Sequence, residues 1–185
     1  WSSVTDSRGP RECVDGVGTV LLACQRVPSA MHVAELTTDE QWDDAVRILH
    51  QLWSHEDEAF VRGFRDEDDY RPFGLYDDMN GSDSGDGDRD EGERLVAVAG
   101  VSIQRVLHHR RHAWIHDLVV DEPLRGRGHG AELLDWIEDW AQSEGCEYVA
   151  LANVLDNDDG LAFYEREGLE RWGYVVETEL DGDVN

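Results

Sequence analysis

Residues 114–144 read WIHDLVVDEPLRGRGHGAELLDWIEDWAQSE, and this stretch decides the fold. Its first seven residues are rich in β-branched and aromatic side chains, which is typical of a strand. Pro123 marks a turn, and an arginine- and glycine-rich loop follows it. After Gly130 the apolar residues recur at intervals of three and four, which predicts an amphipathic helix. A strand, a glycine loop and a helix in this order can form an anion-binding site.

The loop itself contains groups that bind phosphate oxygens. Gly126, Gly128 and Gly130 have no Cβ, so the backbone can approach a ligand and point successive N–H groups at it. The helix that begins near Gly128 adds the positive end of its dipole and its unpaired first-turn donors. Arg125 and Arg127 add positive charge in a chain that is otherwise acidic. We therefore predict that this loop binds a phosphate-bearing ligand.

Two segments in the right order resemble the GCN5-related N-acetyltransferase (GNAT) family. Residues 125–130, RGRGHG, fit the family's Arg/Gln-x-x-Gly-x-Gly/Ala pattern. Residues 157–169, NDDGLAFYEREGL, resemble its Asn-x-x-Ala-x-x-Phe-Tyr-x-x-x-Gly-Phe segment. The resemblance spans residues 31 to about 180. It implies an α/β fold with a central mixed, mostly antiparallel sheet of six or seven strands, flanked by about four helices. It also implies acetyl transfer from acetyl-CoA to a primary amine of an unidentified small molecule or peptide.

The resemblance further implies where acetyl-CoA, the co-substrate, binds. It would lie between the strand that ends near Val120 and a strand at 148–154, with its diphosphate on the loop. The backbone of Leu118 and Val120 would pair with the acetyl and pantetheine amides. Asn157 would hold the pantetheine arm, although an asparagine there could equally cap a helix. The residues expected to contact the cofactor are Leu118, Val119, Val120, Arg125, Gly126, Arg127, Gly128, His129, Gly130, Ala131 and Asn157.

Acetyl transfer needs a proton acceptor for the amine and a proton donor near the departing thiolate. Tyr164 occupies the family's Phe-Tyr position, so the resemblance implies that its phenol protonates the sulfur; its alternative role is a core aromatic beside Phe163. Asp117 matches a position where many relatives carry glutamate and is the candidate base. His116 has the more suitable intrinsic pKa, but strand neighbours alternate between faces, so we expect it to point away. A water-relayed proton path stays open, and Ala152 stands where relatives that acetylate protein amino termini carry glutamate.

Other interpretations of the loop fit less well. Residues 126–131 also satisfy a dinucleotide-binding fingerprint, but residues 121–125 separate the first glycine from its strand, and Asn153 stands where that motif needs an acid. A P-loop needs a lysine, and the chain has none. An ordinary glycine-rich turn is a further alternative. At the level of function, a catalytically silent acyl-CoA-binding regulatory module of the same fold and a nicotinamide-dependent oxidoreductase stay open.

The composition is strongly acidic. The 185-residue chain has a formal net charge of -26, all its basic residues are arginine, and its hydrophobic fraction is still 40%. We interpret this as an acidic globular protein adapted to a salt-rich cytoplasm, as in a halophilic archaeon, rather than as a surface for a basic partner. Binding to nucleic acid requires clustered positive charge, so we expect none.

The first thirty residues have an uncertain status. They lack an initiator methionine, and their apolar run at 17–24 only superficially resembles a lipoprotein cleavage site, so we expect no membrane anchor. Met31 begins a more regular pattern. We therefore divide the chain into a tail, residues 1–30, and an N-acetyltransferase domain, residues 31–185. The three cysteines lack metal-like spacing, which favours a reducing cytoplasm. The sequence leaves a homodimer open.

Alternating strands and helices are predicted for the domain. Strands are expected at 32–36, 72–78, 95–106, 112–120, 148–154 and, bent or as two consecutive strands, at 169–180. Helices are expected at 38–53, 57–64, about 128–145 and 157–166. The spacing of Thr38 and Gln41 predicts a capping box for the first helix, with its apolar stripe formed by Trp42, Val46, Leu49 and Trp53. The resemblance implies that the helical region between the first two strands shapes the acceptor side.

Two clusters of potential metal ligands are interpreted without a metal. Residues 79–93 are rich in Gly, Ser, Asp and Glu, and we expect a mobile acidic loop, because the EF-hand pattern lacks its glutamate at the required offset. A second cluster surrounds a predicted hairpin. We interpret it as a solvated turn with unrelated histidines, namely His108, His109, His112 and His116.

Overall fold

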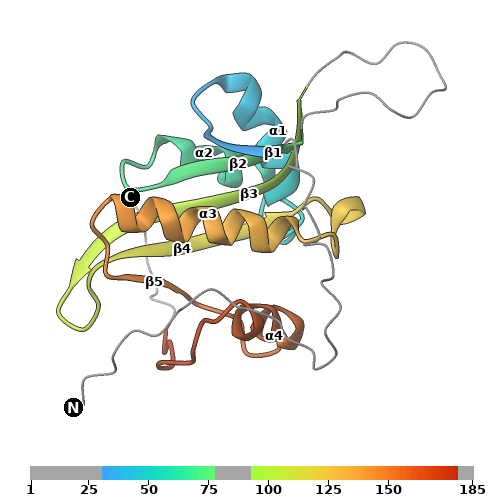
Figure 1. Ribbon diagram of the computed structural model, residues 1–185. Helices are drawn as coiled ribbons and strands as arrows, with labels where there is room; N and C mark the ends of the chain where they lie inside the picture. Colours follow the sequence, from blue (N-terminus) through green and yellow to red (C-terminus); the bar gives the residue numbers. More distant parts are fainter. Residues whose placement is uncertain (1–30, 78–92, 179–185) are drawn as a thin grey trace, which may run out of the picture.

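A computed structural model describes residues 31–77 and 93–178 (Figure 1). The first half contains β1 (Met31–Glu35), α1 (Asp39–Leu49), α2 (Glu58–Gly63), the 3₁₀ turn η1 (Phe64–Asp66), β2 (Arg71–Asp77) and β3 (Arg94–Val106). The second half contains β4 (Arg110–Val120), the 3₁₀ turn η2 (Glu122–Leu124), α3 (His129–Ser143), β5 (Tyr148–Leu151) and α4 (Asp158–Arg166). The predicted tail and nearly all of the predicted acidic loop lie outside the described residues.

The strands form one mixed sheet in the order β1-β2-β3-β4-β5. Neighbouring strands are antiparallel from β1 to β4, and β5 runs parallel to β4. The mixed, mostly antiparallel sheet is therefore as predicted, but the described residues supply five strands rather than six or seven. Residues 169–178 form no strand, and Trp172, Tyr174 and Val176 are largely exposed. An apolar run becomes a strand only where it meets a hydrogen-bonding edge, which this segment does not.

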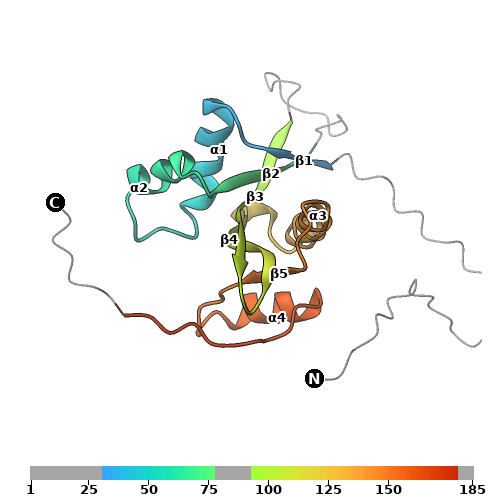
Figure 2. The same ribbon diagram turned by 90° about the vertical axis from the view of Figure 1, so that its left-hand side faces the viewer.

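Helices cover both faces of the sheet, as the two views show (Figures 1 and 2). Helices α1 and α2 lie on one face, α3 lies on the opposite face, and α4 lies beyond β5. Each face has its own apolar cluster: Val46, Leu49 and Val98 belong to the one beneath α1, and Leu133 and Ile137 belong to the one beneath α3. Helices thus bury both faces of the sheet, and α4 lies next to the edge formed by β5.

Helix α1 starts as predicted and ends earlier than predicted. Thr38 and Gln41 form the capping box, with each side chain bonded to the other residue's backbone. The helix ends at Leu49, and the following bonds are tighter, with the amide of Leu52 donating to the carbonyl of Leu49. Trp53 lies beyond the end of α1, but its side chain still packs against the apolar cluster that contains Trp42, Val46 and Leu49, as the predicted stripe requires.

The second half follows its local signals closely. Helix α3 begins directly after Gly128, and Gly145 follows its end with a φ of 76°. Asn157 caps α4, and Gly168 lies just beyond it with a φ of 101°. Glycine tolerates these left-handed backbone conformations, so it stops both helices where the sequence predicts.

Candidate active site

A β-bulge lies in the middle of β4. Gly100 on β3 pairs with Asp117, but the next residue, Val101, pairs with Ile115. One strand residue, His116, is therefore extra. Such a bulge interrupts the alternation of side chains between faces. Asp117 and His116 consequently both lie near Tyr70 on the side of α1 and α2, so the expectation that His116 points away is wrong.

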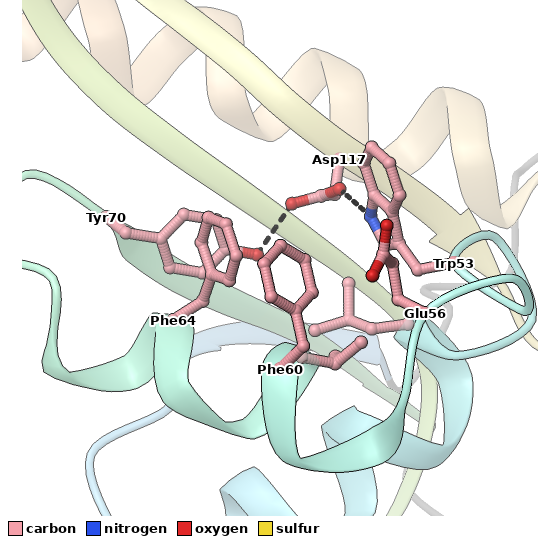
Figure 3. Close-up of a pocket in the computed structure, with 8 residues that line it drawn as sticks. Trp53, Glu56, Phe60, Phe64, Tyr70 and Asp117 are labelled. Carbon is pink, nitrogen blue, oxygen red and sulfur yellow. Dashed lines mark hydrogen bonds between the residues drawn. The ribbon is translucent and has the colours of Figure 1, made fainter. Parts of the chain in front are cut away.

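Two donors hold the carboxylate of Asp117 (Figure 3). The indole Nε1 of Trp53 donates to one oxygen at 2.5 Å, and the hydroxyl of Tyr70 donates to the other at 2.8 Å. Asp117 is only 6% exposed. Burial, together with the negative charge of Asp117, raises the pKa of Tyr70 well above its usual value. Tyr70 therefore stays a neutral donor, and the carboxylate is fixed in one orientation with a further lone pair on each oxygen.

Gly100 makes room for this arrangement. A Cβ on Gly100 would lie 2.1 Å from both Cζ and the hydroxyl oxygen of Tyr70, far inside van der Waals contact. The tyrosine ring therefore lies flat against the backbone of β3. Only glycine at this strand position lets Tyr70 reach Asp117.

His116 is the second titratable group on this face. Its Nε2 lies 2.8 Å from the hydroxyl of Ser102, and its ring centroid lies 5.9 Å from that of Tyr70. Burial lowers the pKa of His116, and the nearby charge of Asp117 opposes that shift only in part. The imidazole is therefore neutral near pH 7 and could accept a proton.

A cavity of about 120 Å³ opens beside Asp117, between β4 and the α1–α2 region (Figure 3). The rings of Phe60, Phe64 and Tyr70 form one wall, with Phe60 and Phe64 packed edge to face at 5.3 Å. Glu56 lies on the far side beside Trp53. The helical region between β1 and β2 thus contributes most of the lining, as expected for an acceptor side.

Strands β4 and β5 separate at the level of this bulge. Their pairing ends with Ile115 opposite Leu151, while β4 continues to Val120. Beyond Ile115 one edge of β4 therefore has no β5 partner, and its backbone groups can pair with a ligand. Leu118, Val119 and Val120, predicted to contact the cofactor, lie on this stretch.

The predicted anion loop follows directly. Gly126 and Gly128 have φ values of 76° and 96°, and, chain neighbours aside, no atom in the described part of the chain lies within 4 Å of a Cβ built on either. Helix α3 begins at His129 and has no side-chain hydrogen bond at its N-cap, Gly128. The first-turn donors, which include those of Gly130 and Ala131, therefore receive no bond from an N-cap side chain, and such donors can bind an anion.

The two loop arginines differ in what they contact. Arg125 donates from Nε to the carbonyl of Val120 at 3.0 Å and from Nη2 to the amide oxygen of Gln51 at 3.2 Å. The same oxygen of Gln51 accepts from the amide of Glu122, so this glutamine ties the end of α1 to the loop. Arg127 is exposed, and its one hydrogen bond within the described residues is a 3.4 Å contact with the carbonyl of Pro123. Arg127 is thus free to swing towards a phosphate, whereas Arg125 holds the loop in place.

Helix α4 lies next to the loop. A Cβ on Gly130 would lie 3.4 Å from the ring of Phe163 and 3.5 Å from Val120. Tyr164 packs edge to face on Phe163 at 5.0 Å, and burial raises the pKa of its phenol. The side chain of Asn157 accepts from the amide of Gly160, so in this structure it acts as the helix cap.

Sequence reasoning missed four residues that shape this site, namely Trp53, Tyr70, Gly100 and Gln51. The glycine in the middle of a strand run was the one available signal, because such a glycine often marks a close approach of another group. The other three lie 47 to 74 residues from their partners. Local patterns carry no information about contacts over such separations.

The histidines of the β3–β4 hairpin are arranged around an aromatic ring. The ring centroids of His108 and His109 lie 5.2 and 4.5 Å from that of Trp172, and His109 also contacts His112. His112 is 2% exposed, so the interpretation as a solvated turn is wrong for this residue. Among residues 31–77 and 93–178, no group of three or more His, Cys, Asp or Glu side chains could hold a metal ion. No helix in this described part is long and apolar enough to cross a membrane.

Sequence comparisons relate this chain to acetyltransferases. A model of the acetyltransferase (GNAT) family matches residues 42–169. The uncharacterized N-acetyltransferase YhdJ of Bacillus subtilis (strain 168) is 28% identical over 154 residues, which cover 81% of this chain and 96% of that protein. The aminoalkylphosphonate N-acetyltransferase of Salmonella typhimurium is 35% identical over 80 residues, covering 42% and 51% of the two chains. Both relatives are bacterial, so an archaeal origin gains no support.

Solved structures share the fold. The aminoglycoside 6'-N-acetyltransferase AAC(6')-Ih from Acinetobacter baumannii has a TM-score of 0.63 and 18% identity, with 82% of this chain and 98% of that chain covered. AAC(6')-Iy, whose structure contains CoA, has a TM-score of 0.63 and 16% identity, with coverages of 84% and 99%. At these identities the likeness concerns the fold alone.

Proposed function

The chain belongs to the acetyltransferase (GNAT) family, and on that premise we propose that it transfers the acetyl group of acetyl-CoA to a primary amine. The observation that supports this most is the continuity of β4. A single strand carries Asp117 towards the cavity, continues from residue 116 to Val120 beyond its pairing with β5, and leads into the start of α3, whose N-cap has no side-chain hydrogen bond. The same strand would therefore position the amine beside Asp117 and lead to the loop that binds the diphosphate.

The chain's residues fit the cofactor in three places. The open backbone at Gly126 and Gly128 suits the diphosphate, with Arg127 adding charge. The free edge of β4 suits the amides of pantetheine and acetyl groups. Asn157 caps α4, so its contribution is to fix the backbone beside the pantetheine arm. When bound, acetyl-CoA would supply an activated thioester.

Proton transfer falls to groups on the two sides of that strand. An ammonium must lose a proton before its nitrogen can attack the acetyl carbon. We propose Asp117 as the proton acceptor, because two hydrogen bonds fix the orientation of its carboxylate and each oxygen keeps a lone pair. His116 on the same face is the alternative acceptor, directly or through water. As the C–N bond forms and the C–S bond breaks, the phenol of Tyr164 gives its proton to the thiolate. The second proton that the nitrogen loses on becoming an amide passes through solvent and restores the phenol, and Asp117 releases the first proton to solvent.

A thiol-release assay with a panel of primary amines at molar KCl tests this function. Asp117→Asn is expected to lower kcat/KM for the amine about 100-fold, while the Kd for CoA changes less than about twofold. His116→Gln is the control for the alternative base and is expected to have a smaller effect. A folded protein that binds CoA but acetylates no amine would instead be the acyl-CoA-binding regulatory module.

Three finer properties belong to the same proposal. The net charge of -26 supports work in a salt-rich cytoplasm, because high salt screens repulsion between carboxylates. We place the protein in the cytoplasm and allow a homodimer, which light scattering would test. We also keep residues 31–185 as the catalytic domain, so a chain that starts at Met31 should fold and be active.

A further inference from the structure

The cavity beside Asp117 has a specific chemical lining. Its walls are aromatic, formed by Trp53, Phe60, Phe64 and Tyr70, and the charged groups that line it are two carboxylates, Glu56 and Asp117. Within the described residues no arginine or histidine lines it. Phe60 is 49% exposed and Phe64 is 38% exposed, although both are large apolar side chains. Exposed aromatic rings at the mouth of a cavity are typical of a ligand site.

The size of the cavity limits what can enter it. Its volume is about 120 Å³. An apolar protein cavity of about 150 Å³ holds one benzene molecule. The space therefore suits a single ring or a short aliphatic chain, with the half-exposed ring of Phe60 extending the contact at the mouth. A molecule of several linked sugar rings is too large to be enclosed.

The charges place the amine end of such a ligand. Each oxygen of Asp117 already accepts one hydrogen bond and keeps a lone pair for an ammonium. The ring of Tyr70 lies beside that carboxylate, and a cation over an aromatic face is attracted to it. Glu56 is partly buried and adds a second negative charge. A negatively charged group would find no positive partner among the lining residues.

We propose that the acceptor is a compact primary amine with one apolar body, an aromatic ring or a short hydrocarbon chain, whose ammonium meets Asp117 and whose body packs on Phe60 and Phe64. This proposal rests on the function proposed above. It separates this chain from the aminoglycoside enzymes that share its fold and from its aminoalkylphosphonate-acetylating relative. The linked sugar rings of an aminoglycoside are too large for the cavity, and the negative charge of a phosphonate would find no positive partner among its lining residues.

The test compares three amines by thiol release at molar KCl: phenethylamine, the aminoglycoside neamine and 2-aminoethylphosphonate. We expect kcat/KM for phenethylamine to exceed that of either other amine at least tenfold. Phe60→Ala should raise its KM about tenfold, because the ring loses apolar contact, and should leave the KM of acetyl-CoA unchanged. The matched control is Leu52→Ala, since Leu52 is 46% exposed and lies in the same region without lining the cavity.

The outcomes separate the two proposals. Preference for neamine or 2-aminoethylphosphonate, or equal effects of Phe60→Ala and Leu52→Ala, would overturn this inference and leave acetyl transfer standing. Binding of CoA without acetylation of any amine would overturn the proposed function. In that case calorimetry with phenethylamine and the CoA-saturated protein decides the inference: saturable binding weakened by Phe60→Ala supports the site, and no binding overturns it.

Discussion

Replacing Gly100 by alanine should damage the site through one clash. The new Cβ would lie 2.1 Å from Cζ and from the hydroxyl oxygen of Tyr70, and the ring is only 8% exposed, so it cannot swing freely. Overpacking a core costs about 1–3 kcal/mol. Displacing the ring also breaks its hydrogen bond to the charged Asp117, which is worth about 1.5–3 kcal/mol. We expect a loss of about 3 kcal/mol or more, which for a chain of this size lowers Tm by about 6–12 °C.

Thermal unfolding and steady-state kinetics measure this effect. Gly63→Ala is the matched control, because nothing lies within 4 Å of a Cβ there and the backbone is helical, so stability should be unchanged or slightly raised. Gly100→Ala should also lower kcat, since Asp117 loses a positioning donor. Adding Tyr70→Ala should remove the clash, so the double variant should be more stable than the sum of the single losses predicts. A Gly100→Ala protein with the Tm and kcat of the wild type would refute the reasoning.

Three further predictions concern catalysis and stability. Tyr164→Phe should lower kcat about 100-fold with an unchanged Kd for CoA, and unchanged turnover would remove this phenol from the mechanism. Burial lowers the pKa of His109, His112 and His116, so below about pH 6.5 the unfolded chain binds more protons than the folded one. The free energy of unfolding should therefore fall as the pH is lowered from 7.5 towards 5. A rise of this free energy in urea unfolding over the same interval would contradict the assignment. Raising KCl from about 0.1 M to about 1 M shortens the Debye length from about 10 to about 3 Å, so the free energy of unfolding should rise, and a fall would contradict repulsion among the carboxylates.

The sequence predicted the elements whose signals are local. The capping box of Thr38 and Gln41, the start of α3 after Gly128 and the end of α4 before Gly168 each depend on residues within one turn. The glycine loop could be placed for the same reason. Its geometry depends on the left-handed backbone conformations of Gly126 and Gly128, and glycine residues can be identified directly in the sequence.

The details of the acceptor side could not be predicted in this way. The bulge at His116 is set by the pairing of β3 with β4, and it reverses the face that simple alternation assigns. Trp53 and Tyr70 reach Asp117 across 64 and 47 residues. Residues 169–178 have strand-like composition but no partner edge. In each case the deciding contact is long-range.

The central claim is that the loop from Arg125 to Gly130 binds the diphosphate of coenzyme A. Calorimetry at molar KCl with CoA and with pantetheine, which lacks the diphosphate and nucleotide, tests it most directly. We predict saturable binding of CoA and at least about tenfold weaker binding of pantetheine, since charge-assisted bonds to phosphate would be lost. A well-folded protein that binds neither compound, or both equally, would contradict the account.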